Sequence, residues 1–153
     1  MKIEFNKQDL LDYIREDVSR LAARAQASDG TPLYDSIRLT SRDDDMMERM
    51  LSYRDGQVRE FLAFCVEDTG DTGYNIVYNI VESRCSKVMS MASLKSLLQQ
   101  YLVDGVLCDW YTRHGIESPI TYDSIDALKS RLVVMLRQGG YRRPLQPFGP
   151  KYK

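Results

Sequence analysis

Two consecutive Asp-Thr-Gly triplets, at residues 68–70 and 71–73, form the pattern in this sequence closest to a catalytic motif. The same triplet carries the active-site aspartate of aspartic proteases, in which two carboxylates about 3 Å apart share one proton. Two adjacent triplets on one loop would not place their carboxylates face to face in this way. Asp, Thr and Gly all favour tight turns, so we interpret the segment as a pair of turns before a strand.

The candidate metal ligands do not follow the spacing of a known site. The twelfth residue counted from Asp68 is Asn79, where an EF-hand loop requires a bidentate glutamate. The run Asp43-Asp44-Asp45 falls at the start of a predicted helix, where successive side chains diverge by about 100°. Carboxylates at that position are favoured by the helix dipole. We therefore predict no metal site and no cofactor.

The nucleophiles and the one imidazole are also widely separated in the chain. Cys65, Cys85 and Cys108 contain no C-x-x-C pair, and a zinc site would need a carboxylate or a second chain as further ligand. Reduced, buried thiols are the expected state. His114 falls in the last turn of a predicted helix, and the sequence singles out no nucleophile to pair with it. No glycine-rich phosphate motif is present. We predict that the protein is not an enzyme.

The length and charge of the chain exclude further classes of protein. Its 153 residues suit one domain, and 21 basic against 22 acidic side chains exclude a broadly basic nucleic-acid binder. No apolar run approaches the roughly 18 residues of a membrane span. Residues 1–5 lack the apolar stretch of a signal peptide. These features predict a cytoplasmic protein that does not enter a membrane.

Four segments carry apolar residues at three- and four-residue steps, which predicts amphipathic helices. Asn6 is the expected N-cap of the first helix, and Asp123 is the expected N-cap of the fourth. Gly56 either kinks or divides the second helix, and one continuous helix is favoured. The third segment is the most apolar and is therefore predicted to be central. The predicted helices cover residues 7–27, a second segment that begins at 40 or 41 and ends at 65, and residues 91–114 and 123–138.

One convincing strand is predicted, from Tyr74 to Val81. A solitary strand leaves backbone N–H and C=O groups unpaired, so it must find a partner. The partner could be residues 33–40, which read equally as strand or loop, residues 2–5, or a strand of another chain. One face of the predicted strand carries Tyr74, Ile76, Tyr78 and Ile80.

Residues 141–153 differ in composition from the rest of the chain. They contain three of the five prolines, four basic residues and no acid, so this segment carries +4 and residues 1–140 carry −5. Proline fixes φ and removes a hydrogen-bond donor, which excludes a helix here. We predict either an extended arm that docks on a neighbouring copy or a disordered terminus.

The second half of the chain resembles small structural proteins of phages and prophages, of the head–tail connector or tail-completion type. The resemblance covers residues 74–150 and implies a mostly helical subunit that forms rings at the portal, in the host cytoplasm or in the virion. It implies no catalytic residue. It is carried by the apolar helix with Leu94, Leu97, Leu98, Tyr101-Leu102-Val103, Leu107 and Trp110-Tyr111, by one further helix, and by Arg142-Arg143-Pro144 with Pro147-Phe148.

The sequence therefore predicts a mainly α fold: a compact four-helix domain over residues 1–140, with one or two short β-strands and an extended C-terminal arm over residues 141–153. We expect a non-enzymatic virion assembly subunit that binds copies of itself or neighbouring phage proteins. The alternatives are a small regulatory adaptor, a protein that contacts DNA weakly through its C-terminal arm, and an enzyme with an unrecognised site. The predicted partner-binding residues are Tyr74, Ile76, Tyr78, Ile80, Arg142, Arg143, Pro144 and Phe148.

Overall fold

The computed structural model describes residues 1–22, 30, 43–67, 73–85 and 90–137. The predictions for residues 33–40 and for the arm at 141–153 lie outside this part of the chain. The elements in order are β1 (Lys2–Asn6), α1 (Lys7–Ala22), α3 (Asp44–Phe61), β2 (Val66–Glu67), β3 (Asn75–Ile80), the 3-10 helix η2 (Glu82–Arg84), α4 (Met91–Arg113) and α5 (Tyr122–Arg137). A mainly α fold with four α-helices and a small sheet is thus confirmed for the described residues.

The sheet is antiparallel, with β3 between β1 and β2. Ile3 faces Tyr78 across the β1–β3 pair, and Val66 faces Ile80 across the shorter β2–β3 pair. The predicted strand is therefore confirmed, and its partner along the full length of β3 is the N-terminal segment of the same chain. This outcome was one of the three left open by the sequence.

Short polar side chains fix where the helices begin. Asn6 caps α1 as predicted, because its Oδ1 accepts the backbone N–H groups of Gln8 and Asp9 at 2.9 and 3.2 Å. The cap predicted for the fourth helix was wrong: Thr121 Oγ1 accepts the N–H of Ser124 at 3.2 Å, so α5 begins before Asp123. A hydroxyl two residues earlier serves the same purpose, and Asp123 falls in the first helical turn.

Two of the predicted helix ends shift for local reasons. Helix α3 runs unbroken through Gly56, as favoured, but stops at Phe61, four residues before its predicted end. Turns at residues 62–65, where the Cys65 N–H donates to the Leu62 carbonyl at 2.9 Å, redirect the chain into β2. Helix α4 ends at Arg113, and Gly115 follows with a φ of +65°, a conformation that favours glycine.

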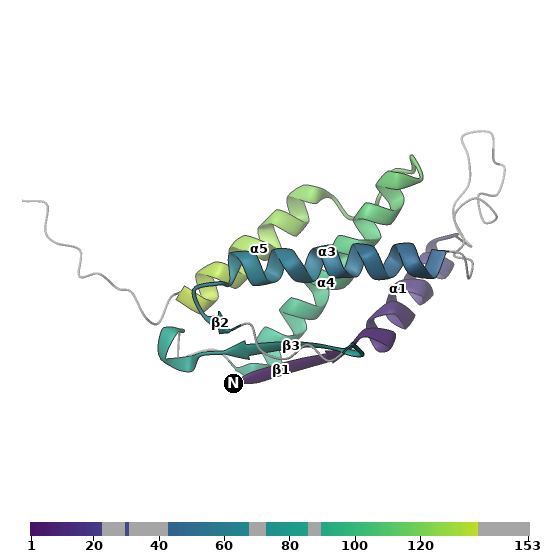
Figure 1. The fold of residues 1–153 in the computed structure, drawn as a ribbon. Helices are drawn as coiled ribbons and strands as arrows, with labels where there is room; N and C mark the ends of the chain where they lie inside the picture. Colours follow the sequence, from purple (N-terminus) through teal and green to yellow (C-terminus); the bar gives the residue numbers. More distant parts are fainter. Residues whose placement is uncertain (23–29, 31–42, 68–72, 86–89, 138–153) are drawn as a thin grey trace, which may run out of the picture.

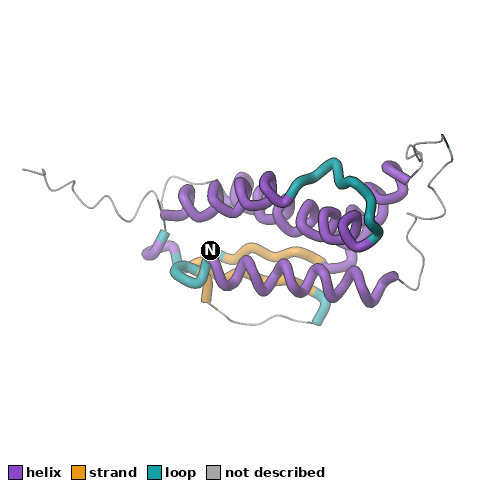
Figure 2. Tube along the Cα trace, turned by 90° about the horizontal axis from the view of Figure 1, so that it is seen from above, coloured by secondary structure: helices purple, strands orange, loops and turns teal. Residues whose placement is uncertain are grey.

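Helix α4 is the centre of the structure, as its apolar character predicted. It packs against α1, α3, α5 and β1, and twelve of its residues are buried, including Trp110 at 1% exposure. Figure 1 shows α3, α4 and α5 on one side of the sheet, and Figure 2 shows the helices running along the strands. Across the part of the chain that is described, no helix combines the length and the hydropathy needed to cross a membrane.

Candidate partner-binding surfaces

The predicted partner-binding face of the strand lies largely in the core. Ile76, Tyr78 and Ile80 are exposed by 1%, 0% and 3%, whereas Tyr74, just before β3, is 83% exposed. The strand edge expected to receive another chain is occupied by β1. The expectation of a free edge is therefore corrected: three of the four side chains contact their own core, and Tyr74 alone remains on the surface. The arm residues Arg142, Arg143, Pro144 and Phe148 lie outside the described residues.

Tyr74 lines a cleft of about 550 Å³ between the sheet and α3. The junction of β1 and α1 forms one wall, α3 forms the second, and the start of β3 forms the third. The Asp55 carboxylate lies in the lining and is 9% exposed. The cleft is lined by Asn6, Lys7, Gln8, Leu11, Glu48, Leu51, Ser52, Asp55, Gly73, Tyr74 and Ile76.

A buried charge cluster beside this cleft joins α3 to the sheet. The Tyr78 hydroxyl donates to Asp55 Oδ1 at 2.7 Å, and Arg59 Nε lies 3.2 Å from the same oxygen. Arg59 Nη2 also donates to the Val77 carbonyl at 3.2 Å, and its guanidinium lies 5.1 Å from the centre of the Tyr78 ring. Because Asp55 is engaged by both groups, its role here is to hold the helix on the sheet.

A second buried ion pair joins α3 to α4. Arg54, 5% exposed, donates from Nη2 and Nε to the two carboxylate oxygens of Asp109 at 2.7 and 3.0 Å. Its Nη1 donates to Gln57 Oε1 at 3.0 Å, and the Tyr122 hydroxyl donates to Asp109 Oδ1 at 3.1 Å. A Cβ at Gly105 would lie 2.7 Å from Arg54 Cδ, so this glycine makes room for the arginine.

The sequence analysis did not predict that the neighbouring residues Arg54 and Asp55 are both buried, although the sequence contains a signal for it. The buried positions of α3 are Met47, Leu51, Arg54, Asp55 and Val58, which follow the steps of an apolar stripe. Two opposite charges at the centre of such a stripe indicate that neighbouring elements supply buried partners. The partners themselves, Asp109 on α4 and Tyr78 on β3, are distant in sequence.

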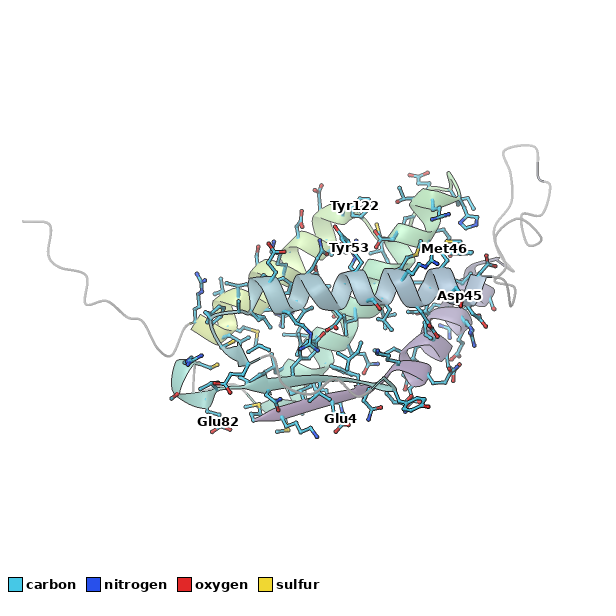
Figure 3. All side chains as sticks on the ribbon, in the orientation of Figure 1. Glu4, Asp45, Met46, Tyr53, Glu82 and Tyr122 are labelled. Atoms are coloured by element: carbon cyan, nitrogen blue, oxygen red, sulfur yellow. The ribbon has the colours of Figure 1, made fainter. Side chains whose placement is uncertain are left out.

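On the side of the helices away from the sheet, an open groove of about 530 Å³ separates α3 from the end of α4. We call it the Tyr–Met groove, and it is lined by Asp45, Met46, Arg49, Met50, Tyr53, Asp109 and Arg113. Tyr53 is 60% exposed, and the nearby Tyr122 is 46% exposed. Figure 3 shows Met46, Tyr53 and Tyr122 on this side, and Glu4 and Glu82 on the sheet side. This surface therefore combines exposed aromatic, Met and Arg side chains.

A third groove, of about 590 Å³, lies between α1 and α4. We call it the α1–α4 groove, and it is lined by Tyr13, Asp17, Ala92, Lys95, Ser96, Gln99, Gln100, Val103 and Asp104. Burial raises the pKa of Asp104, the Gln100 amide partly offsets that rise, and the Asp17 carboxylate adds to it. No basic side chain in the described residues forms an ion pair with Asp104. The groove thus contains a half-buried carboxylate without a cationic partner.

We expect Asp104→Asn to raise the free energy of unfolding at neutral pH. A carboxyl group whose pKa is raised by folding stabilises the fold while protonated, and this contribution is lost as the pH rises through the raised pKa. The gain from Asn should therefore shrink as the pH falls below the ordinary range of aspartate. Urea unfolding at neutral and acidic pH measures this difference. The control Glu117→Gln, on the exposed loop after α4, should change stability by less than about 0.5 kcal/mol.

The three cysteines are free and buried, as predicted. Burial, followed by the neighbouring Cys85 thiol, raises the pKa of Cys65 to about 12. Because the thiolate is the reactive form, we expect the native protein to resist alkylation by iodoacetamide at neutral pH. Mass spectrometry before and after denaturation should show three labelled thiols only in the unfolded protein. Rapid labelling of Cys65 or Cys85 in the folded protein would contradict this expectation.

His114 is exposed at the end of α4, where its Nδ1 lies 2.9 Å from the Trp110 carbonyl and its ring lies 3.9 Å from the Trp110 ring. These contacts hold the imidazole against its own helix. In the part of the chain that the structure describes, no group of three or more His, Cys, Asp or Glu side chains could hold a metal ion. Comparison with protein-family models, curated proteins and solved structures found no match for the chain.

Proposed function

We propose that this protein is a non-enzymatic assembly subunit of a phage or prophage virion, of the head–tail connector or tail-completion type. It acts by binding copies of itself and neighbouring structural proteins. The observation that carries the proposal is the Tyr–Met groove, with the exposed rings of Tyr53 and Tyr122 beside it. Tyr, Met and Arg are enriched at protein–protein interfaces, and aromatic and Arg anchors dominate their energetics.

The surroundings of the groove support a role in recognition. Met46 and Met50 are half-buried and flexible, so they can adapt to the shape of a partner. Arg49 and Arg113 line the groove without an ion pair to any described residue, and they are available to carboxylates of a partner. Beneath them, the Arg54–Asp109 pair fixes the spacing of α3 and α4. The groove therefore presents adaptable side chains on a fixed support.

Sedimentation velocity of the full chain over a range of concentrations tests this proposal. We expect self-association that weakens at least about tenfold in a Tyr53→Ser/Met46→Ser variant, because central anchors carry most of the binding free energy. The matched control is Tyr74→Ser, which removes an even more exposed tyrosine from the sheet side. A chain that stays monomeric throughout, or that associates equally well after both changes, would contradict this role of the groove.

Weak DNA contact is the second candidate, and the observation that favours it is the +4 charge of residues 141–153. Four cations would give non-specific binding that weakens steeply with salt. Filter binding of duplex DNA at low and at physiological salt separates the candidates. Retention at low salt that vanishes at high salt would favour DNA contact, and no retention at either concentration would exclude it.

A further inference from the structure

We propose that the α1–α4 groove binds Arg142 and Arg143 from the C-terminal arm of a neighbouring copy, with Asp17 and Asp104 as the acceptors. This inference rests on the proposed assembly function, to which it adds a defined contact between subunits. It is carried by the groove itself, by its unneutralised carboxylate, and by the composition and reach of the arm.

The groove supplies the groups that recognise a guanidinium. Arginine pairs with carboxylates through parallel N–H···O bonds and also stacks on aromatic rings. Asp17 and Asp104 lie on facing helices, close enough for Asp17 to disfavour the charged form of Asp104. Tyr13 stands beside them with 52% of its surface exposed. Asp17 already lies 3.8 Å from Arg20 of its own helix, so an incoming guanidinium would chiefly neutralise Asp104 and cover the tyrosine ring.

A second, independent feature lies on the same seam between α1 and α4. The Tyr111 hydroxyl is buried and has no hydrogen-bond partner among the described residues, and the residue is 3% exposed. Burial, and then the Asp17 carboxylate, raises the pKa of Tyr111, so this hydroxyl lies near the acidic end of the groove. Buried polar atoms in native proteins are almost always paired. Because this hydroxyl is inaccessible to solvent and Tyr111 does not line the groove, it marks an unsatisfied polar position beside the groove and not a contact for the arm.

The placement of the elements favours a neighbouring copy over the same copy. Helix α5 ends beside β2 at one end of the fold, and α1 lies at the opposite end (Figure 1). Helix α3 runs between these ends, and its 18 residues span about 27 Å. Arg142 and Arg143 follow Arg137 by five and six residues, which reach roughly 20 Å at full extension. The backbone of these residues, even at full extension, therefore covers less than the length of α3, which favours the groove of a neighbouring copy.

Contact between opposite ends of successive copies is a head-to-tail arrangement. Such interfaces close into rings when the rotation between copies allows it, and otherwise they continue into filaments. The charges agree with this arrangement, because the arm carries +4 and residues 1–140 carry −5. Each copy would offer one arm and one groove, so the same contact repeats around the assembly.

A mixing experiment with two full-length variants tests the inference. The groove variant Asp17→Asn/Asp104→Asn keeps its arm, and the arm variant Arg142→Gln/Arg143→Gln keeps its groove. Alone, each should associate at least about tenfold more weakly than the unmodified chain in sedimentation velocity. Mixed in equal amounts, they should form one heterodimer, because an intact arm meets an intact groove. Glu117→Gln serves as a control for loss of one acidic charge.

The outcomes separate this inference from the proposed function. Loss of association in each variant and its recovery in the mixture would support arm-to-groove docking. Loss without recovery would overturn it, because an intact arm would then have failed to bind an intact groove. Association unchanged by both variants but weakened by Tyr53→Ser/Met46→Ser would overturn the docking and leave the assembly function standing. DNA binding lost in the arm variant, with association intact, would assign the arm to DNA.

Discussion

Replacing Arg54 by methionine is expected to lower the free energy of unfolding by about 3–5 kcal/mol. The arginine is 5% exposed and is the cation that neutralises the Asp109 carboxylate. Removing it leaves a largely buried carboxylate whose remaining hydrogen-bond partner among the described residues is the Tyr122 hydroxyl. Since a carboxylate without its cation pays the full cost of desolvation, the loss should far exceed that of an exposed arginine. Thermal unfolding should show a decrease in Tm of roughly 10 °C or more.

The same substitution at Arg49 is the matched control for Arg54→Met. Arg49 is exposed on the same helix, so Arg49→Met should change stability by less than about 0.5 kcal/mol. The double variant Arg54→Met/Asp109→Leu should recover much of the loss, because an apolar pair of similar volume requires no desolvated charge. Equal Tm values for Arg54→Met and Arg49→Met would show that the pair does not hold α3 on α4.

Replacing Asp55 by alanine is the second change expected to have a large effect, a loss of about 3 kcal/mol in the free energy of unfolding. Asp55 accepts the hydroxyl of the fully buried Tyr78 and pairs with Arg59, so its removal costs two contacts of a charged group. These contacts join α3 to the central strand. Urea unfolding followed by circular dichroism measures the loss directly.

Two further variants identify the source of the Asp55 effect. Tyr78→Phe removes one hydrogen bond and keeps the ion pair, so its cost should be smaller, at about 1–2 kcal/mol. Glu60→Ala removes an exposed acid from the same helix and should be close to neutral. If Asp55→Ala proved no more costly than Glu60→Ala, the contacts of Asp55 would add nothing measurable to the link between helix and sheet.

Local signals in the sequence predicted the helices and the central strand well. The Asn6 side chain capping the first N–H groups of α1 and Gly115 after α4 act on residues only a few positions away. The apolar stripes act in the same way, because they depend on the three- and four-residue steps of one helix. The alternation in residues 74–81 likewise predicted a strand, found at Asn75–Ile80. Each of these features can be read without knowing where the rest of the chain lies.

The surfaces could not be read in this way. Periodicity, strand alternation and the run of basic residues predicted four helices, one strand and a basic terminal segment. The pairing of β1 with β3, which places Ile76, Tyr78 and Ile80 in the core, is set by the three-dimensional fold. The fold also joined Arg54 to Asp109, 55 residues apart in the chain, and set Asp17 beside Asp104. The physical reason is that burial and electrostatic pairing depend on distance in space, whereas capping and periodicity depend on distance along the chain.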